Sequence, residues 1–165
     1  MKKRLAVAFT GPSNSGKTTL IVKVASILID RFEKNVAIIK NDPKDKARFD
    51  VEGKDSFKFA QTGADVIVTS PTRTTLFSHK HQELDEMISL LGDFDILLVE
   101  GLKTLPLPRI AIFRKRLDPD YFEVSEALAI DETINKDEIP DTIPTLDLND
   151  PDTVIEWILT HAKEV

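Results

Sequence analysis

The stretch that most constrains this chain is GPSNSGKT, from Gly11 to Thr18. Its spacing, G-x-x-x-x-G-K-[ST], is that of the P-loop, which wraps nucleotide phosphates between a strand and a helix. The apolar residues 5–10 before it predict a buried strand, and apolar residues at helical spacing from 17 to 32 predict a helix after it. Strand, loop and helix in this order are typical of an α/β nucleotide-binding domain.

The residue types in the loop suit an anionic ligand. Glycine at positions 11 and 16 lets the chain curl closely around a phosphate, and the backbone N–H groups of residues 13–18 supply donors. The N-terminus of the following helix adds positive potential. We expect Lys17 to reach the β- and γ-phosphates and the Thr18 hydroxyl to coordinate Mg²⁺. The nucleotide-binding residues predicted here are Gly11, Pro12, Ser13, Asn14, Ser15, Gly16, Lys17, Thr18 and Thr19.

A second motif is the apolar run DILLVEGLK over residues 95–103. An apolar strand that ends in an acid beside a P-loop is the Walker B arrangement. Glu100 is therefore expected to bind Mg²⁺ or its water, together with Thr18, or to polarise an attacking water. Lys17 and Glu100 are accordingly candidate catalytic residues. Asp95 begins the strand at its far end and is expected to be a structural cap.

The rest of the chain alternates between strand and helix signals. Strands are predicted at 36–40, 66–70, 95–101, 109–114 and 126–131, and 74–79 predicts a strand or a turn. Helices are predicted at 56–64, 81–92 and 151–162, the first with Asp55 as a candidate N-cap and the last with Asp150 as N-cap and Pro151 at its first position. Continuous apolar strands indicate a mostly parallel sheet with helices on both faces. We predict one P-loop NTPase domain over residues 1–165.

Composition limits the classes of function. The net charge of −6 over 165 residues argues against bulk binding to nucleic acid or to an anionic membrane. The chain has no cysteine, which excludes disulfides and thiolate metal sites. No apolar run approaches the ~18 residues of a membrane span, and the start of the chain does not fit a signal peptide. We expect a cytoplasmic protein.

Several blocks resemble one known family in order and spacing. GPSNSGKTTL, IIKNDPKDKARFDVEGKDSFKFAQTGA, DILLVEGLK, PRIAIFR and LDLNDP together cover roughly residues 5–160. They are similar to the bacterial molybdopterin-guanine dinucleotide biosynthesis protein B family, MobB. The resemblance implies a homodimeric GTP-binding protein with weak GTPase activity. It also implies a role in assisting a partner guanylyltransferase, MobA, which attaches GMP to molybdopterin.

The resemblance adds residues to the predicted site. Gly101 and Lys103 follow Glu100 in the VEGLK motif, and Lys54 and Asp55 belong to the GKDS motif. Family members commonly carry histidine after the lysine of the second strand, whereas this chain has Asn41 there. Asparagine forms hydrogen bonds but cannot serve as a base. Asp42 is then the candidate for a Mg²⁺-linked catalytic role, and at most slow GTP hydrolysis is expected.

The sequence does not decide which residue would recognise the guanine base. Residues 135–138, Asn-Lys-Asp-Glu, lie close to the N-K-x-D pattern of many GTPases and follow the predicted strand 126–131. Asp131, Asp147 and Asn149 are rival candidates. Arg114 to Arg116 is the densest basic stretch of the chain, and a solvated strand end is its default interpretation.

Two other functions remain open at this point. A P-loop small-molecule kinase would use Glu100 or Asp42 as the base for an acceptor hydroxyl. A nucleotide-gated adaptor would bind GTP without hydrolysing it. The three functions differ in their products: a GTPase releases free phosphate, a kinase forms a phosphorylated product, and an adaptor forms almost neither.

Overall fold

The computed structural model describes residues 3–165 and divides into two compact units. Unit 1 comprises the described residues up to Asn41 together with Leu91–Val165, and unit 2 comprises Asp42–Leu90. The sequence pattern predicts a single domain over residues 1–165 without this division, and the single domain stays a prediction. No helix in residues 3–165 has the length and apolar character needed to cross a membrane.

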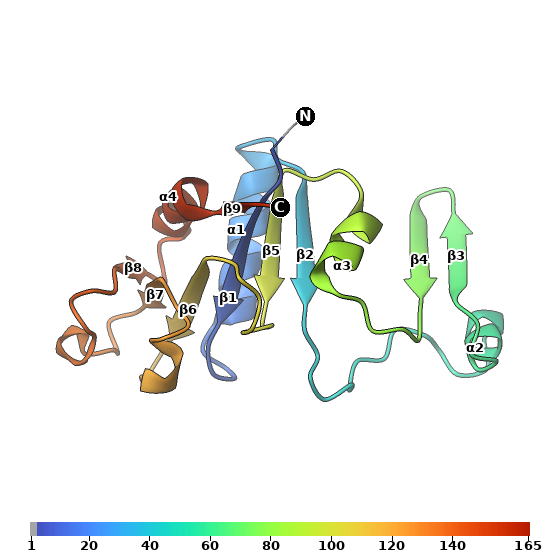
Figure 1. Ribbon diagram of the computed structural model, residues 1–165, viewed down its shortest axis with the longest axis horizontal. Coiled ribbons are helices and arrows are strands. Elements are labelled where there is room, and N and C mark those ends of the chain that lie inside the picture. Colours follow the sequence, from blue (N-terminus) through green and yellow to red (C-terminus); the bar gives the residue numbers. More distant parts are fainter. Residues whose placement is uncertain (1–2) are drawn as a thin grey trace. The chain divides into compact units, whose positions relative to one another are not determined.

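Unit 1 is built on a central sheet (Figure 1). Six strands lie side by side in the order β2, β5, β1, β6, β7, β8, and every neighbouring pair among them is parallel. A short strand β9, Lys163–Glu164, pairs antiparallel with β1. In chain order the six strands are β1 Leu5–Thr10, β2 Val36–Lys40, β5 Ile96–Glu100, β6 Arg109–Phe113, β7 Ala127–Ile130 and β8 Thr145–Asp147. The predicted α/β class with a mostly parallel sheet is confirmed.

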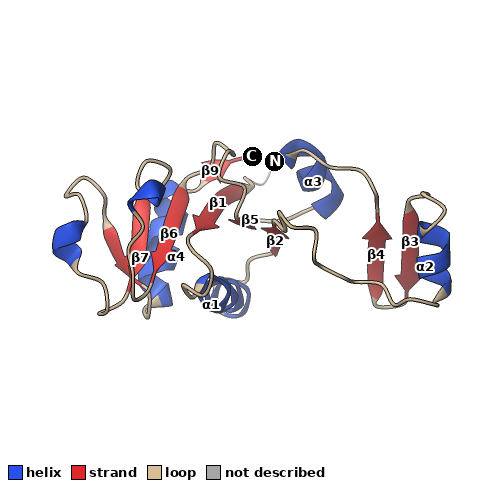
Figure 2. Ribbon diagram, turned by 90° about the horizontal axis from the view of Figure 1, so that it is seen from below, coloured by secondary structure: helices blue, strands red, loops and turns tan. Residues whose placement is uncertain are grey.

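Helices α1, Lys17–Asp30, and α4, Pro151–His161, share one hydrophobic core with the sheet. Figure 2 looks onto the end of the sheet at which the parallel strands finish, with α1 against one face. Alternate strand residues point into this core because side chains in a strand point to opposite faces in turn. Its buried residues include Val7, Phe9, Ile96, Leu98, Ile110 and Ile112 from strands and Leu20, Val24, Leu28, Val154, Ile155 and Ile158 from helices.

The opposite face of β6 and β7 carries a second core. Phe113 and Leu128 pack there with side chains of the segments that follow these strands, and Phe113 meets Tyr121 edge-on at 5.7 Å between ring centroids. Two short 3₁₀ turns, η1 Pro119–Tyr121 and η2 Lys136–Glu138, belong to these segments. Packing on both faces explains why the strand sequences are continuously apolar.

The two helices of unit 1 begin differently. At α4 the Asp150 carboxylate accepts a hydrogen bond from the Asp152 backbone N–H at 3.0 Å and Pro151 takes the first position, as predicted. At α1 the N-cap is Gly16, with φ of 99° and no side-chain cap. The first N–H groups of α1 are therefore left to another acceptor, which is the condition for binding an anion at a helix N-terminus.

Unit 2 contains α2 Asp55–Ala60, β3 Val66–Ser70, β4 Arg73–Phe77 and most of α3, Leu84–Leu91. Strands β3 and β4 form their own antiparallel pair. The strand predicted at 66–70 is present but lies outside the parallel sheet: only two residues separate it from β4, which permits an antiparallel hairpin, whereas a parallel connection needs a crossover of a dozen or more. The predicted N-cap at Asp55 is also displaced by one: Lys54 occupies that position and Asp55 begins α2.

Candidate functional site

The P-loop joins the end of β1 to the start of α1. Gly11 has φ of 137°, and a Cβ placed there would lie 2.5 Å from the Ile112 carbonyl oxygen of β6. Asn14 and Gly16 also have positive φ, 62° and 99°. The loop thus takes a backbone path that requires glycine at position 11, for steric as well as conformational reasons.

The Lys17 side chain forms hydrogen bonds with the backbone of its own loop. Its ammonium donates to the carbonyl oxygens of Gly11 at 3.0 Å and Pro12 at 2.7 Å. An ammonium has three donors, so one remains for a ligand. Burial lowers the pKa of Lys17 and Lys40 lowers it further, while Glu100 opposes both. The group is held as a partly desolvated cation at the mouth of the loop.

Ser15 supplies an independent indication that the loop is built for a ligand. Its hydroxyl oxygen is buried and has no hydrogen-bond partner among residues 3–165. A buried polar group without a partner costs free energy, so such groups are uncommon and each calls for an explanation, of which a ligand is one. Here the hydroxyl sits inside a loop whose backbone donors and lysine already suit phosphate oxygens, so the residues present fit that group.

Glu100 ends β5 directly beside the loop. It lies opposite Phe9 in the register of β1 and β5, and the Gly101 backbone N–H donates to the Phe9 carbonyl at 2.9 Å. Its carboxylate forms an ion pair with Lys40, 2.5 Å from Nζ to Oε2. Thr18 is exposed in the first turn of α1. A hydroxyl and a carboxylate are the hard oxygen donors that Mg²⁺ prefers, so this pair fits the metal.

Asn41 packs against the turn after Glu100. Gly101 has φ of 88°, and a Cβ there would lie 3.0 Å from the Cβ of Asn41. The Asn41 backbone N–H donates to the Glu100 carbonyl at 3.0 Å. Asn41, where the resemblance led us to expect histidine, therefore lies at the edge of the site, where Gly101 leaves room for it.

Lys103 and Arg109 have other contacts. The Lys103 ammonium lies 3.7 Å from the centroid of the Tyr121 ring, a cation–π contact. Buried Arg109 donates to the carbonyls of Leu102 at 3.0 Å and Leu105 at 3.1 Å, which ties down the segment after β5. Nucleotide binding by Lys103 stays a prediction.

The remaining predicted residues belong to unit 2. The Asp42 carboxylate accepts from the backbone N–H groups of Lys46 at 2.7 Å and Ala47 at 2.6 Å. Lys54 occupies the N-cap position of α2 without a capping side-chain bond, and Asp55 lies 3.6 Å from Lys58 in an exposed ion pair. These contacts organise unit 2, and a role of Asp42, Lys54 or Asp55 toward the nucleotide stays a prediction.

The candidate base readers gather at the ends of β7 and β8. A cavity of about 460 Å³ there is lined by residues that include Asp131, Lys136, Asp147 and Asn149. The Asn135 side chain accepts from the Asp137 backbone N–H at 3.1 Å, as the cap of its own turn. The structure thus brings three rivals and Lys136 to one cavity and assigns Asn135 to a local turn.

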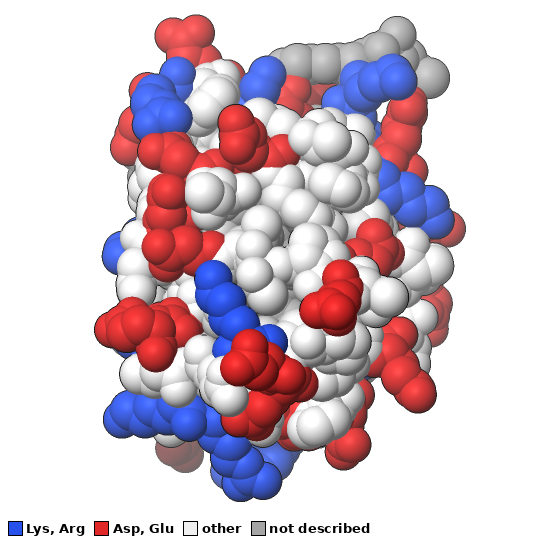
Figure 3. Space-filling view, turned by 90° about the vertical axis from the view of Figure 1, so that its left-hand side faces the viewer, with Lys and Arg blue, Asp and Glu red and all other residues white. Residues whose placement is uncertain are grey.

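Two basic residues after β6 lie beside the P-loop. A cavity of about 270 Å³ is lined by Arg114, Arg116, Leu117 and Asp118 together with P-loop residues Pro12, Ser13, Asn14 and Ser15. Seen from the β8 and α4 side, Lys and Arg side chains lie along the lower edge, where the parallel strands end in Figure 1, and also along the upper edge, with acidic side chains among them (Figure 3). The sequence pattern favoured a solvated strand end for this basic stretch.

Lys40, the ion-pair partner of Glu100, was given no role from the sequence. Its only sequence signal is that it ends its strand, as Glu100 does.

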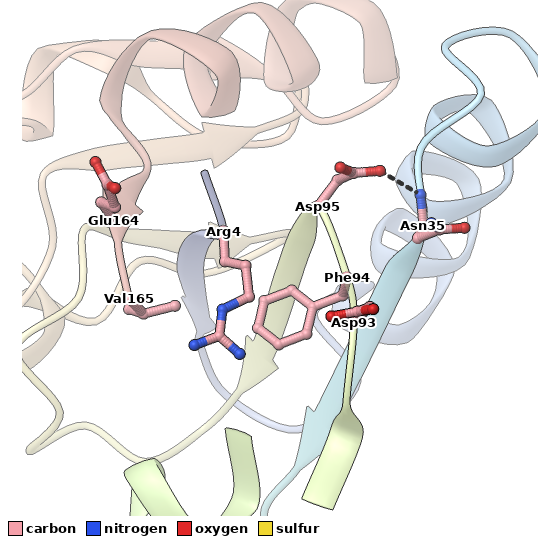
Figure 4. A pocket seen from close by; sticks show the side chains of 7 residues that line it. All are labelled: Arg4, Asn35, Asp93, Phe94, Asp95, Glu164 and Val165. Carbon is pink, nitrogen blue, oxygen red and sulfur yellow. Dashed lines mark hydrogen bonds between the residues drawn. The ribbon is translucent and has the colours of Figure 1, made fainter. Parts of the chain in front are cut away.

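A hollow at the opposite end of the sheet is a poor place for a nucleotide. It measures about 570 Å³ and lies where the strands begin, with Arg4, Phe94 and the acids Asp93, Asp95 and Glu164 in its wall (Figure 4). Asp95 accepts a hydrogen bond from the Asn35 backbone N–H at 2.8 Å, which confirms its structural role. The acids would repel phosphates, whereas the P-loop end attracts them.

Comparison with known proteins identifies the family of this chain. A family model described as molybdopterin guanine dinucleotide synthesis protein B (MobB) matches residues 6–132. The chain belongs to the MobB family. This confirms the resemblance found in the sequence motifs.

MobB-like proteins also match along most of the chain. A molybdopterin-guanine dinucleotide biosynthesis adapter protein of Haemophilus influenzae is 29% identical over 162 residues, 92% of this chain and 86% of its own length. A putative adapter protein of Methanocaldococcus jannaschii is 28% identical over 156 residues, 87% of this chain, which spans only 64% of that relative. A crystal structure of molybdopterin-guanine biosynthesis protein B superposes with a TM-score of 0.72 at 27% identity, covering 94% of this chain and 97% of that one.

Proposed function

We propose that this member of the MobB family binds GTP with Mg²⁺ at its P-loop and acts as an adapter in molybdopterin guanine dinucleotide synthesis. In that role it would assist the guanylyltransferase MobA. The P-loop geometry carries the nucleotide proposal: Lys17 is fixed by two loop carbonyls with one donor left over. The descriptions of its relatives as adapter proteins support the pathway.

The chain's own residues divide the work of binding. The backbone N–H groups of the loop and of the uncapped start of α1 hold the phosphate oxygens, and Lys17 neutralises the β- and γ-phosphates. Thr18 and Glu100 would hold Mg²⁺, which when bound neutralises phosphate charge. The Lys40 ammonium forms an ion pair with the same Glu100 carboxylate and supplies a further positive charge at this end of the sheet.

The cavity at the ends of β7 and β8 is the proposed base site. Guanine presents N–H groups that a carboxylate accepts. Asp131 is engaged by Thr133 and Arg114, so Asp147 is the carboxylate we assign to the base, with Asn149 beside it. The Asp147 Oδ1 atom accepts from the Asn149 backbone N–H at 2.8 Å, which orients it.

Slow turnover follows from the groups around Glu100. Its carboxylate contacts the Lys40 ammonium, which occupies part of the space from which an attacking water would approach it, and Asn41 at its side has no basic group. We propose that the isolated protein is at most a slow GTPase, forms a homodimer and works in the cytoplasm.

One titration tests the nucleotide assignment. Calorimetry with GTP, GDP and ATP in the presence of Mg²⁺ should show GTP favoured over ATP by tenfold or more, about 1.4 kcal/mol. Phosphate release in the same samples should stay below about 1 s⁻¹. A preference for ATP would overturn the guanine assignment and favour a small-molecule kinase.

The adapter role needs its own test. Adding the protein with GTP to purified MobA and molybdopterin should increase formation of the dinucleotide, and a Lys17→Ala variant should not. A MobA rate that is the same with and without this protein, at saturating GTP, would contradict the adapter role while leaving GTP binding intact.

A further inference from the structure

Arg114 is the first residue after β6 and lies against the P-loop. Its guanidinium carbon is 4.0 Å from the position that a Cβ would take at Gly16. It also lines the cavity shared with residues 12–15 of the loop. The Arg114 guanidinium therefore lies within van der Waals reach of the P-loop at Gly16.

Asp131 holds Arg114 from the end of β7. The Arg114 Nε atom lies 2.9 Å from the Asp131 Oδ2 atom, and the Asp131 side chain is only 5% exposed. The other oxygen of Asp131 accepts from the Thr133 hydroxyl at 2.5 Å and from the Thr133 backbone N–H at 3.1 Å. Both oxygens of the carboxylate thus have a partner, and the one that contacts Arg114 fixes the Nε edge of the guanidinium.

The outer edge of Arg114 is free to bind. A guanidinium has five N–H donors, and the four on its terminal nitrogens make no hydrogen bond to any protein group described in residues 3–165. The side chain is 41% exposed, so these donors reach solvent. A fixed guanidinium with free donors suits phosphate oxygens in particular, because it binds two of them side by side.

The ion pair stands between two cavities. Arg114 lines the cavity at the P-loop, and Asp131 lines the cavity at the ends of β7 and β8. Leu148, which follows β8, also approaches Gly16, 3.9 Å from the Cβ position there. A nucleotide with its terminal phosphates in the P-loop and its base in the second cavity would pass this point with the phosphates nearest the sugar.

We infer that Arg114 binds the phosphates that GTP and GDP share, and that Asp131 is its positioning residue. This inference rests on the proposed nucleotide site and deepens it. It assigns Asp131 to the arginine rather than to the base. It also makes the discrimination between GTP and GDP independent of Arg114, since the γ-phosphate is not its contact.

The test compares Arg114→Gln with the unaltered protein by calorimetry with GTP and with GDP, at fixed Mg²⁺. Loss of a charge-assisted bidentate contact should weaken both nucleotides by about tenfold or more, with the GTP-to-GDP affinity ratio unchanged within about threefold. Arg31→Gln is the matched control, because Arg31 forms a 2.7 Å ion pair with Asp152 on the exposed surface. It should bind both nucleotides like the unaltered protein.

Two further variants separate contact from folding. Asp131→Asn should lower the affinities for GTP and GDP by the same factor. That factor should be smaller than for Arg114→Gln, because the arginine remains and is only less firmly held. The double variant Arg114→Gln with Asp131→Asn removes both charges, so no unpaired buried carboxylate remains. It should fold and show the full loss of affinity.

The outcomes are distinct. Unchanged affinity for both nucleotides in a folded Arg114→Gln protein overturns the inference alone. A loss confined to GTP also overturns it and moves Arg114 to the γ-phosphate. An unaltered protein that binds no guanine nucleotide overturns the proposed function and this inference together.

Discussion

Lys40 and Glu100 lie directly opposite each other on the neighbouring parallel strands β2 and β5, and their charged groups meet at 2.5 Å. Each residue ends its strand at the edge of the sheet that carries the P-loop. The acid assigned to Mg²⁺ is therefore already partnered by a protein cation. Under the proposed function, metal and lysine would compete for the same carboxylate, so the magnesium requirement of GTP binding should depend on Lys40.

We expect Lys40→Met to lower the Mg²⁺ concentration that half-saturates GTP binding, by roughly two- to fivefold, the effect of an exposed ion pair worth up to about 1 kcal/mol. Glu100→Gln should raise that concentration by about tenfold or more, since even residues that only orient a metal's ligands contribute on this scale and Glu100 is proposed as a ligand. Both are measured by titrating Mg²⁺ at fixed GTP. An unaltered magnesium requirement in Glu100→Gln would remove Glu100 from the metal site.

Lys17→Ala should weaken GTP binding by about 100-fold, roughly 2.7 kcal/mol, because it removes a charged donor to the terminal phosphates. The protein should remain folded, with a melting temperature lowered by no more than about 6 °C for the two lost bonds to loop carbonyls. Lys23→Ala, exposed on the same helix, is the control and should bind normally. GTP affinity that survives in folded Lys17→Ala would disprove the P-loop assignment.

Gly11→Ala should destabilise the fold by roughly 2–4 kcal/mol, combining backbone strain with a steric clash. The clash arises because the added Cβ would lie 2.5 Å from the Ile112 carbonyl oxygen, a backbone atom that cannot move aside easily. Gly92→Ala is the matched control, since Gly92 also has positive φ, 69°, but open space around it. It should cost only about 1 kcal/mol. Equal losses in urea denaturation would show that the close approach to Ile112 carries no weight.

Asp131 should make stability depend on pH in the acid range. Burial raises the pKa of this carboxyl, but hydrogen bonds from Thr133 and the Arg114 charge more than offset burial, so the net pKa is below its ordinary value of 3.8. A lowered folded-state pKa stabilises the fold above the unfolded pKa, and this contribution is lost as pH falls through the folded value. Asp131→Asn should therefore be less stable than the unaltered protein at about pH 7, and the difference should shrink below about pH 4. Urea midpoints that differ equally at both pH values would contradict this.

Local sequence patterns were sufficient for most of the fold. The strands at 5–10 and 36–40, the helix after the P-loop and the capped helix at Asp150 all appear where predicted. Each depends on neighbouring residues alone: an apolar run, a helical spacing or an aspartate before proline. The hairpin of β3 and β4 was missed as a separate sheet because strand partners are not encoded in the strand's own residues. The two-residue connection was the only local clue.

The candidate site divides in the same way. The sequence by itself determined the P-loop, its lysine, the acid after β5 and membership of the MobB family, because these lie in contiguous motifs whose spacing is fixed by the chain. Only the tertiary structure paired Lys40 with Glu100, and Arg114 with Asp131 beside Gly16. These partners lie on, or directly after, separate parallel strands that are joined by long crossovers, so their proximity depends on strand order and register. Strand order and register are set by packing of the whole sheet, and no local pattern carries them.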